Sequence, residues 1–176
     1  MGTALLRTGE FVCFLDHSNY RREALMSGAV DGLLRRIQQQ YGGLIELCVP
    51  GVQYRDWCAV VDALVRDRYR MTLSTAGEPV PVRTPPEKEF TDGERVDHLL
   101  KVRVGRQRWT TQFYSASLID FQGDPEELRT TSDLDDLREF GRLLHRSTGR
   151  RTVLVPETLD PESVEPYLEF GRPGMP

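Results

Sequence analysis

Four basic side chains stand close together in the middle of the chain, at Lys101, Arg103, Arg106 and Arg108. Apolar residues alternate with them on both sides of Gly105, a pattern typical of two β-strands joined by a two-residue turn. Such a hairpin places the basic side chains on one outward face or at its tip. Because arginine binds carboxylates and phosphates through a bidentate fork, this face is a candidate surface for an acidic protein, RNA or a phosphate. The alternative is a solvated basic face.

The expected turn also fixes which hairpin residues face each other, and it places Arg103 opposite Arg108. Like charges directly opposite each other destabilise a sheet, so we expect a neighbouring carboxylate to offset them. The acidic segments 124–139 and 157–169 supply such carboxylates. Alternatively, these segments meet a basic partner, as in an acidic inhibitor of a nuclease or another basic toxin.

A second group of polar residues, from Asp16 to Asn19, directly follows the apolar run 10–15. Open α/β sheets bind ligands at the carboxyl ends of their strands. Asp16 is therefore a candidate metal ligand, and Asn19 is a candidate contact for a phosphate or a neighbouring carboxylate. The alternative is local: these residues turn the chain, and Ser18 or Asn19 caps the helix that follows.

The stretch Phe14-Leu15-Asp16-His17-Ser18-Asn19 is similar to the opening motif of the NYN and PIN-like ribonucleases, an apolar strand that closes on Asp-x-x-Asn. The resemblance implies a metal-dependent nuclease with Asp16 as a metal ligand and Asn19 in the site. Those enzymes also need acids at later strand ends, because two-metal chemistry relies on several carboxylates. The second and third predicted strands end at 49–51 and 74–75, which contain no acid.

The cysteines and histidines do not have the spacing of a metal site or of a nucleophile with its base. Cys13, Cys48 and Cys58 are expected to be reduced and buried, as is typical of a cytoplasmic protein. We place His98 at a strand edge and His145 at a helix C-terminus, where a cation is favoured. No phosphate-binding glycine motif occurs, and no apolar run approaches the roughly 20 residues that span a bilayer. We therefore predict no cofactor and no membrane contact.

The chain has 176 residues, a net charge of −4 and 39% apolar residues, which fits one domain with a buried core. This charge excludes a general nucleic-acid coat protein, because such proteins are strongly basic. Basic residues concentrate in the first predicted helix and in the hairpin, whereas acids dominate the final third. Nucleic acid therefore remains open as a partner through the hairpin face, but another protein is favoured.

Hydrophobic periodicity predicts alternating strands and helices in the first third, a central hairpin, and a helix followed by a strand near the end. The predicted strands are 10–15, 44–49, 69–73, 100–104, 108–113, 117–121 and 152–155, and the predicted helices are 20–40, 54–68 and 132–146. Four prolines between 75 and 93 predict a long extended loop. Residues 157–176 hold four more prolines and several acids, and we expect a loose tail there.

These segments predict a single α+β domain over 1–156, in which a mixed or mostly antiparallel sheet of about five to seven strands is covered by two or three helices. The predicted function is a non-enzymatic, cytoplasmic protein-binding module. Its concrete form is an immunity-type inhibitor or an adaptor of a bacterial defence system. The hairpin face and the loop 75–93 form the predicted contact surface. The alternative is a metal-dependent nuclease centred on Asp16.

Overall fold

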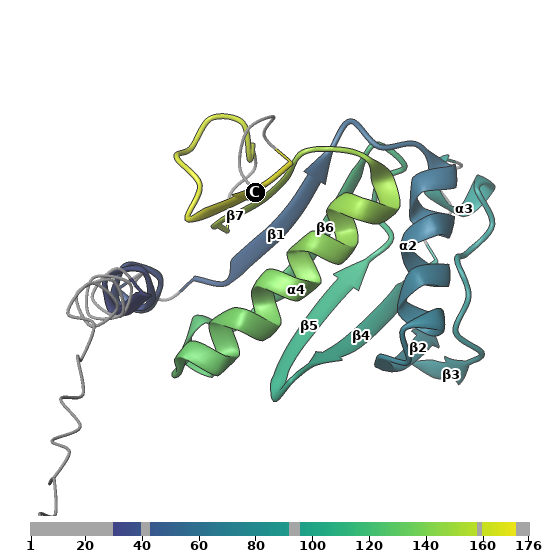
Figure 1. Ribbon diagram of the computed structural model, residues 1–176. Helices are drawn as coiled ribbons and strands as arrows, with labels where there is room; N and C mark the ends of the chain where they lie inside the picture. The colour runs from purple at the N-terminus through teal and green to yellow at the C-terminus, as the bar shows by residue number, and fades with distance from the viewer. Residues whose placement is uncertain (1–29, 40–42, 92–95, 158–159, 172–176) are drawn as a thin grey trace, which may run out of the picture.

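The described part of the chain forms one eight-stranded sheet with two long helices on one face (Figure 1). The structure is a computed structural model, and it describes residues 30–39, 43–91, 96–157 and 160–171. The strands are β1 (Ile45–Pro50), β2 (Arg70–Thr75), β3 (Glu78–Val80), β4 (His98–Val104), β5 (Gln107–Gln112), β6 (Leu118–Gly123), β7 (Thr152–Pro156) and β8 (Leu168–Phe170). The helical segments are 30–38, α2 (Tyr54–Arg66), the short α3 (Lys88–Thr91), the 3-10 turn η1 (Pro125–Glu127) and α4 (Thr131–Thr148).

Neighbouring strands are antiparallel throughout, in the order β3-β2-β4-β5-β6-β1-β7-β8. Three connections cross over other strands: β1 is joined to β2 through α2, β3 to β4 through the segment that contains α3, and β6 to β7 through α4. The two long helices α2 and α4 lie along the same face of the sheet, and they also pack on each other (Figure 1). We call the face away from α2 and α4 the open face.

The main core lies between the sheet and the two long helices, and Leu34 and Ile37 of the segment 30–38 join it. A small second cluster of Cys48, Val153 and Val155 is buried on the open face. Along β4, buried apolar side chains alternate with exposed basic ones, as the sequence predicts. Val102 pairs with Trp109 across the hairpin, and both are buried on the helix side. The ring of Phe140 from α4 lies 6.0 Å from the ring of Trp109 and 5.1 Å from that of Phe121, measured between centroids. α4 therefore holds the hairpin in place, which leaves its basic face outward.

The predicted α+β class is confirmed, but the sheet has more strands than the expected five to seven. The short strands β3 and β8 form its two edges, and they lie inside the segments predicted as a loop and as a tail. β3 tolerates Pro79 because an edge strand does not need every N–H for pairing. The two-residue turn before β3 has positive φ at both positions, 50° at Ala76 and 84° at Gly77. Parts of the predicted loop and tail are therefore regular structure.

The remaining predicted elements agree with the structure to within a few residues, where it describes them. The predicted strand 10–15 and the helix before residue 30 lie outside the described residues, whereas 30–38 is helical. α4 begins at Thr131, one residue before the predicted start at 132, and Thr130 is its N-cap. The N–H of Asp133 donates to the Thr130 hydroxyl and the N–H of Thr130 donates to the Asp133 carboxylate, a capping box that fixes this start.

Two cysteines are described, and both are free thiols. Cys48 lies buried in β1, and Cys58 is partly exposed in α2. Cys13 lies outside the described residues. Among the helices that are described, none has both the length and the apolar character that crossing a bilayer requires.

Gly141 of α4 lies against Phe170 of β8, and a Cβ at Gly141 would overlap the aromatic ring. Gly141→Ala is therefore expected to lower the free energy of unfolding by about 1–3 kcal/mol, because overpacking displaces the ring. At an unobstructed helical position the same change raises stability by about 0.5–1 kcal/mol. Urea unfolding followed by circular dichroism measures the difference.

Gly32→Ala is the matched control. Gly32 lies in the helical segment 30–38, and nothing is within 4 Å of a Cβ added there. This variant is expected to keep or increase the stability of the wild type. If Gly141→Ala stabilised the chain to the same extent, β8 would not pack on α4 as described.

Candidate anion-binding site

Three arginines lie side by side on the open face, on neighbouring strands. Arg103 of β4 is directly opposite Arg70 of β2 on one side and Arg108 of β5 on the other. We call Arg70, Arg103 and Arg108 the arginine row; Lys101 shares its face, opposite Thr110. The predicted opposition of Arg103 and Arg108 is confirmed. Because like charges at such positions repel, the row is unfavourable unless other groups offset it.

Sequence reasoning finds Arg103 and Arg108 but misses Arg70. The alternation at 69–73 predicts a strand there, which the structure places at β2. However, the pairing of β2 with β4 joins segments far apart in the sequence, and no local pattern indicates it. Arg70 is therefore identified as a member of the site only through the sheet topology.

Carboxylates of the chain itself hold two of the predicted binding residues. The Nε and Nη2 atoms of Arg106 each donate to an oxygen of Asp133 at 2.6 Å. The Nε atom of Arg108 lies 3.1 Å from Oε1 of Glu127. Both carboxylates come from the acidic segment 124–139, which therefore supplies the expected internal counter-charge.

The other basic residues of the open face are not neutralised in this way. Among the described residues, no carboxylate pairs with Arg70, Arg103 or Lys101. The Nη1 atom of Arg103 donates to the backbone carbonyl of Arg106 at 2.6 Å. That bond orients the guanidinium group of Arg103 and leaves its charge uncompensated.

Asp133 connects the hairpin tip to the start of α4. Its carboxylate accepts the backbone N–H of Arg129 at 3.0 Å and that of Thr130 at 2.7 Å, in addition to the two bonds from Arg106. Its backbone carbonyl accepts Nε2 of Gln107 at 2.6 Å. Asp133 is buried, and the hydrogen bond from Arg106 is the main reason that the pKa of its carboxyl lies well below its usual range. The same bond raises the pKa of Arg106.

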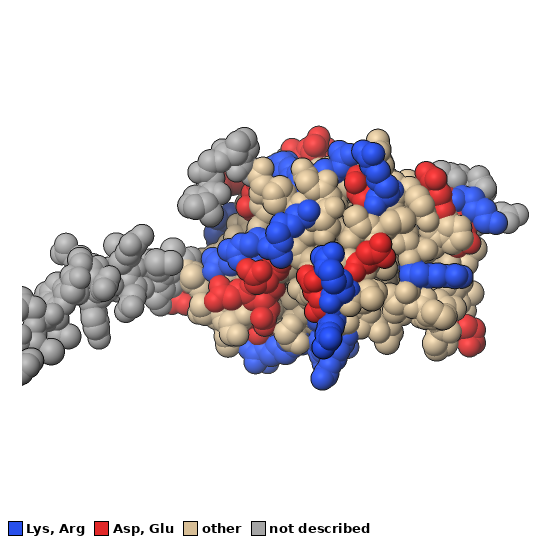
Figure 2. Space-filling view, turned by 45° about the vertical axis from the view of Figure 1, so that its right-hand side comes forward, with Lys and Arg blue, Asp and Glu red and all other residues tan. Residues whose placement is uncertain are grey.

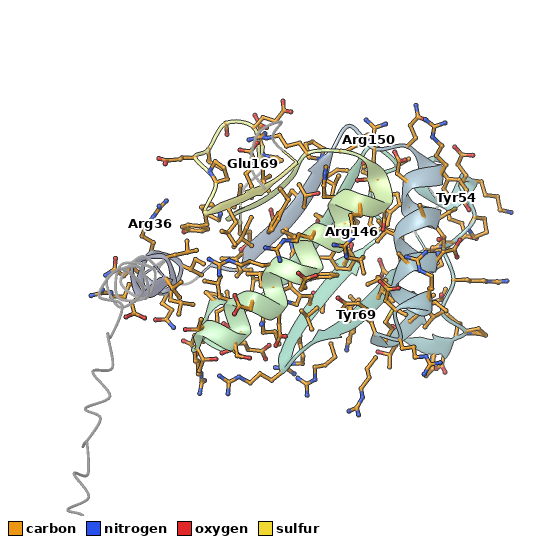
Figure 3. The ribbon with its side chains drawn as sticks, in the orientation of Figure 1. Arg36, Tyr54, Tyr69, Arg146, Arg150 and Glu169 are labelled. Atoms are coloured by element: carbon orange, nitrogen blue, oxygen red, sulfur yellow. The ribbon has the colours of Figure 1, made fainter. Side chains whose placement is uncertain are left out.

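A cavity of about 480 Å³ lies between the hairpin tip and the turn from α2 into β2. We call it the arginine pocket, and its lining residues are Asp67, Arg68, Tyr69, Arg70, Arg103, Gly105 and Arg106. Tyr69 lies between α2 and α4 in Figure 3, and its ring centroid is 5.9 Å from that of Phe140. Burial raises the pKa of this tyrosine. The pocket shares Arg70 and Arg103 with the arginine row, so the two form one continuous basic surface.

The Pro-rich segment 75–93 packs at the opposite end of β4. His98, the first residue of β4, is buried; its Nδ1 atom is 2.9 Å from Oγ1 of Thr75, and its Nε2 atom is hydrogen-bonded to Glu89 of α3. A cavity of about 230 Å³ adjoins these residues. Since β4 has seven residues, this end lies about 20 Å from the hairpin tip. The structure does not bring the two predicted contact surfaces together.

An acidic pair lies on the open face of β6 and β1. Asp120 is directly opposite Cys48, and Glu46 accepts a hydrogen bond from Nε2 of Gln122 at 3.0 Å. Burial, assisted by the charge of Glu46, raises the pKa of Asp120 to about 6. Burial also raises the pKa of the Cys48 thiol. In the described part of the chain, no group of three His, Cys, Asp or Glu side chains is placed to hold a metal ion.

The candidate nuclease residues Asp16 and Asn19 lie outside the described residues, so their role in a metal site stays a prediction.

No protein-family model, curated protein or solved structure matches the chain. Its function must therefore be inferred from its own residues.

Charges are balanced locally on the side of the molecule that carries the helices. Figure 2 shows basic and acidic side chains next to one another there. Along α4, Arg138 pairs with Asp135 at 2.9 Å, and Arg142 pairs with Glu139 at 2.5 Å. On the open face, Arg70 and Arg103 are adjacent and have no such carboxylate partner among the described residues, which makes them the candidate site for an external anion.

Replacing Asp133 tests its role as a link. Asp133→Asn is expected to lower the free energy of unfolding by about 1–2 kcal/mol at pH 7, because the helix cap and the ion pair are weakened. A carboxyl with a lowered pKa in the folded state stabilises the chain above its unfolded pKa of about 3.9 and loses this contribution at lower pH. The stability difference from the wild type should therefore shrink as the pH falls below about 4. Chemical denaturation across this range measures it, and a constant difference would contradict the assignment.

The half-buried carboxyl of Asp120 contributes to stability with the opposite pH dependence. Its folded pKa of about 6 lies above the unfolded value, so the folded chain binds the proton more readily. The contribution of Asp120 to the free energy of unfolding of the wild type should therefore become more favourable as the pH falls from about 6 to about 4. Asp120→Asn is expected to raise the free energy of unfolding by about 2 kcal/mol at pH 7.5, because it removes a buried charge, and this gain should vanish near pH 4.

Unfolding of Asp120→Asn and of the exposed control Asp62→Asn at several pH values gives the comparison. The control is expected to follow the wild type throughout. A gain from Asp120→Asn that persisted unchanged at pH 4 would show that charge burial is not its cause.

Proposed function

We propose that the chain is a non-enzymatic protein-binding module whose arginine row holds an acidic surface of a partner protein. One observation carries this proposal: Arg70 and Arg103 are directly opposite each other, and no described carboxylate pairs with either. Opposite charges at these positions would stabilise the sheet, whereas like charges destabilise it. Carboxylates from a partner would offset this repulsion, and arginine binds them in a bidentate geometry.

The character of the open face favours a protein over RNA. Proteins that bind single-stranded nucleic acid combine a basic groove with aromatic side chains on which bases stack. The open-face side chains of β2, β4 and β5, all within the described residues, include no aromatic one: they are Arg70, Thr72, Ser74, Leu99, Lys101, Arg103, Arg108, Thr110 and Gln112. The net charge of −4 also opposes the long-range attraction of a polyanion. A folded protein with a local acidic patch fits both features.

An inhibitor of the immunity type or an adaptor is the concrete form of this proposal. Both act by covering a surface of the partner, and neither needs a catalytic group. A cytoplasmic location belongs to the same proposal, and the free thiols of Cys48 and Cys58 support it because cytoplasmic thiols stay reduced.

The test uses a fluorescently labelled, glutamate-rich peptide, and fluorescence anisotropy measures its binding at low and moderate salt. The double variant Arg70→Gln/Arg103→Gln is expected to bind at least about tenfold more weakly, because it loses two charge-assisted contacts. The matched control Arg138→Gln/Arg142→Gln removes two arginines of α4 that already have acidic partners. It should bind the peptide as the wild type does.

Two results would overturn the proposal. Equal affinity of the wild type and Arg70→Gln/Arg103→Gln would show that the arginine row does not hold the acidic chain. Tighter binding of a poly(U) RNA of equal length, lost in the same double variant, would assign the surface to nucleic acid.

A further inference from the structure

Arg68 lies two residues after the end of α2, in a backbone conformation that usually belongs to glycine. Its φ is 60°, in the left-handed region. Its N–H bonds to the carbonyl of Val65 at 3.1 Å, and the N–H of Tyr69 bonds to the carbonyl of Leu64 at 3.0 Å. These two bonds form a Schellman motif, in which the position of Arg68 is normally a glycine because a Cβ is strained there. The chain therefore keeps an arginine where glycine would fit the backbone better.

A residue that is retained in a strained conformation points to a role for its side chain. The side chain of Arg68 makes no hydrogen bond or ion pair with any described residue, so it does not stabilise the turn. It lines the arginine pocket. We therefore place the role of the Arg68 side chain in the pocket.

The lining of the pocket holds more positive charge than the described carboxylates neutralise. Arg106 is bound by both carboxylate oxygens of Asp133. Asp67, an acid of the lining, is paired with Arg66, whose Nε lies 3.1 Å from Oδ1. The lining residues that remain without a carboxylate partner among the described residues are Arg68, Arg70 and Arg103.

The pocket is also partly preorganised for a ligand. Arg103 is anchored by its bond to the carbonyl of Arg106, and Arg106 is itself fixed by Asp133. Arg70 is fixed at its backbone by the pairing of β2 with β4. Groups that are already ordered lose less entropy when they bind, which favours affinity.

We propose that the arginine pocket binds a phosphoryl group. A carboxylate carries one charge and two oxygens, which a single guanidinium fork satisfies. A phosphoryl group on a side chain carries a charge of about −1.5 to −2 and three acceptor oxygens. These match the three arginines of the lining that no described carboxylate neutralises. This inference deepens the proposed function and rests on it, because Arg70 and Arg103 also belong to the arginine row. The acidic partner thus places a phosphorylated residue at the end of the row.

The test compares two labelled, glutamate-containing peptides that differ only by phosphorylation of one central serine. Anisotropy with the wild type should give at least about tenfold tighter binding of the phosphorylated peptide, equivalent to about 1.4 kcal/mol. Arg68→Gly should reduce this preference to less than about twofold, since it removes one of three guanidinium groups. Its melting temperature should not fall, because glycine relieves the left-handed strain. Arg68→Gln, which keeps the Cβ, should lose the preference in the same way.

Ala76→Gly is the matched control for the backbone. Ala76 has a φ of 50°, and it lies in the β2–β3 turn, at the end of β2 away from the pocket. This variant relieves the same kind of strain without removing a charge. It should therefore keep the full preference for the phosphorylated peptide.

The outcomes separate this inference from the proposed function. Equal affinity of wild type for both peptides, unchanged by Arg68→Gly, would overturn the pocket inference and leave the proposed function intact. Inorganic phosphate has the same chemistry as the phosphoryl group and tests the other source of the ligand. Suppose that it raises the melting temperature of the wild type but not of Arg68→Gly, and that neither peptide binds. The pocket then binds free phosphate, and the proposed function fails. If neither peptide binds and inorganic phosphate has no effect, both proposals fail.

Discussion

The buried carboxylate of Asp133 is the contact on which the geometry of the basic surface depends. It caps α4 and binds Arg106, so the start of the helix and the tip of the hairpin are held together. The carbonyl of Arg106 in turn orients Arg103. On the core side, Gln107 donates to the Asp133 carbonyl and accepts from the indole of Trp109 at 3.2 Å. One acidic residue thereby ties an exposed arginine to the centre of the core.

Two unfavourable features of the described structure meet at the arginine pocket. The opposition of Arg70 and Arg103 and the left-handed backbone of Arg68 have different physical causes, namely charge repulsion and steric strain. All three residues nevertheless line one pocket. By contrast, the ion pair between Arg150 of the α4–β7 turn and Asp56 of α2, at 3.0 Å, stabilises a contact between two elements. Natural proteins tend to break local rules at functional positions, and the pocket fits this tendency.

The sequence predicts those parts of the fold that depend on neighbouring residues. Alternation and a glycine turn are local, so the register of β4 with β5 and the opposition of Arg103 and Arg108 follow from them. The pairing of β2 with β4 is not local, and Arg70 is missed for that reason. The left-handed conformation of Arg68 is not predicted by the sequence, because glycine is the residue that marks such a turn. The sequence therefore predicts Arg103 and Arg108 as members of the site, whereas Arg70 is identified from the sheet topology and Arg68 from its backbone conformation.

The two edges of the sheet bear on how the protein behaves at high concentration. β3 and β8 have three residues each, and β3 carries a proline, so neither edge offers a long row of free backbone groups. Another chain has little to pair with at such an edge. The exposed arginine row can therefore wait for a partner without the sheets of two molecules joining edge to edge into fibrils. Association is then directed to side chains, which can be specific.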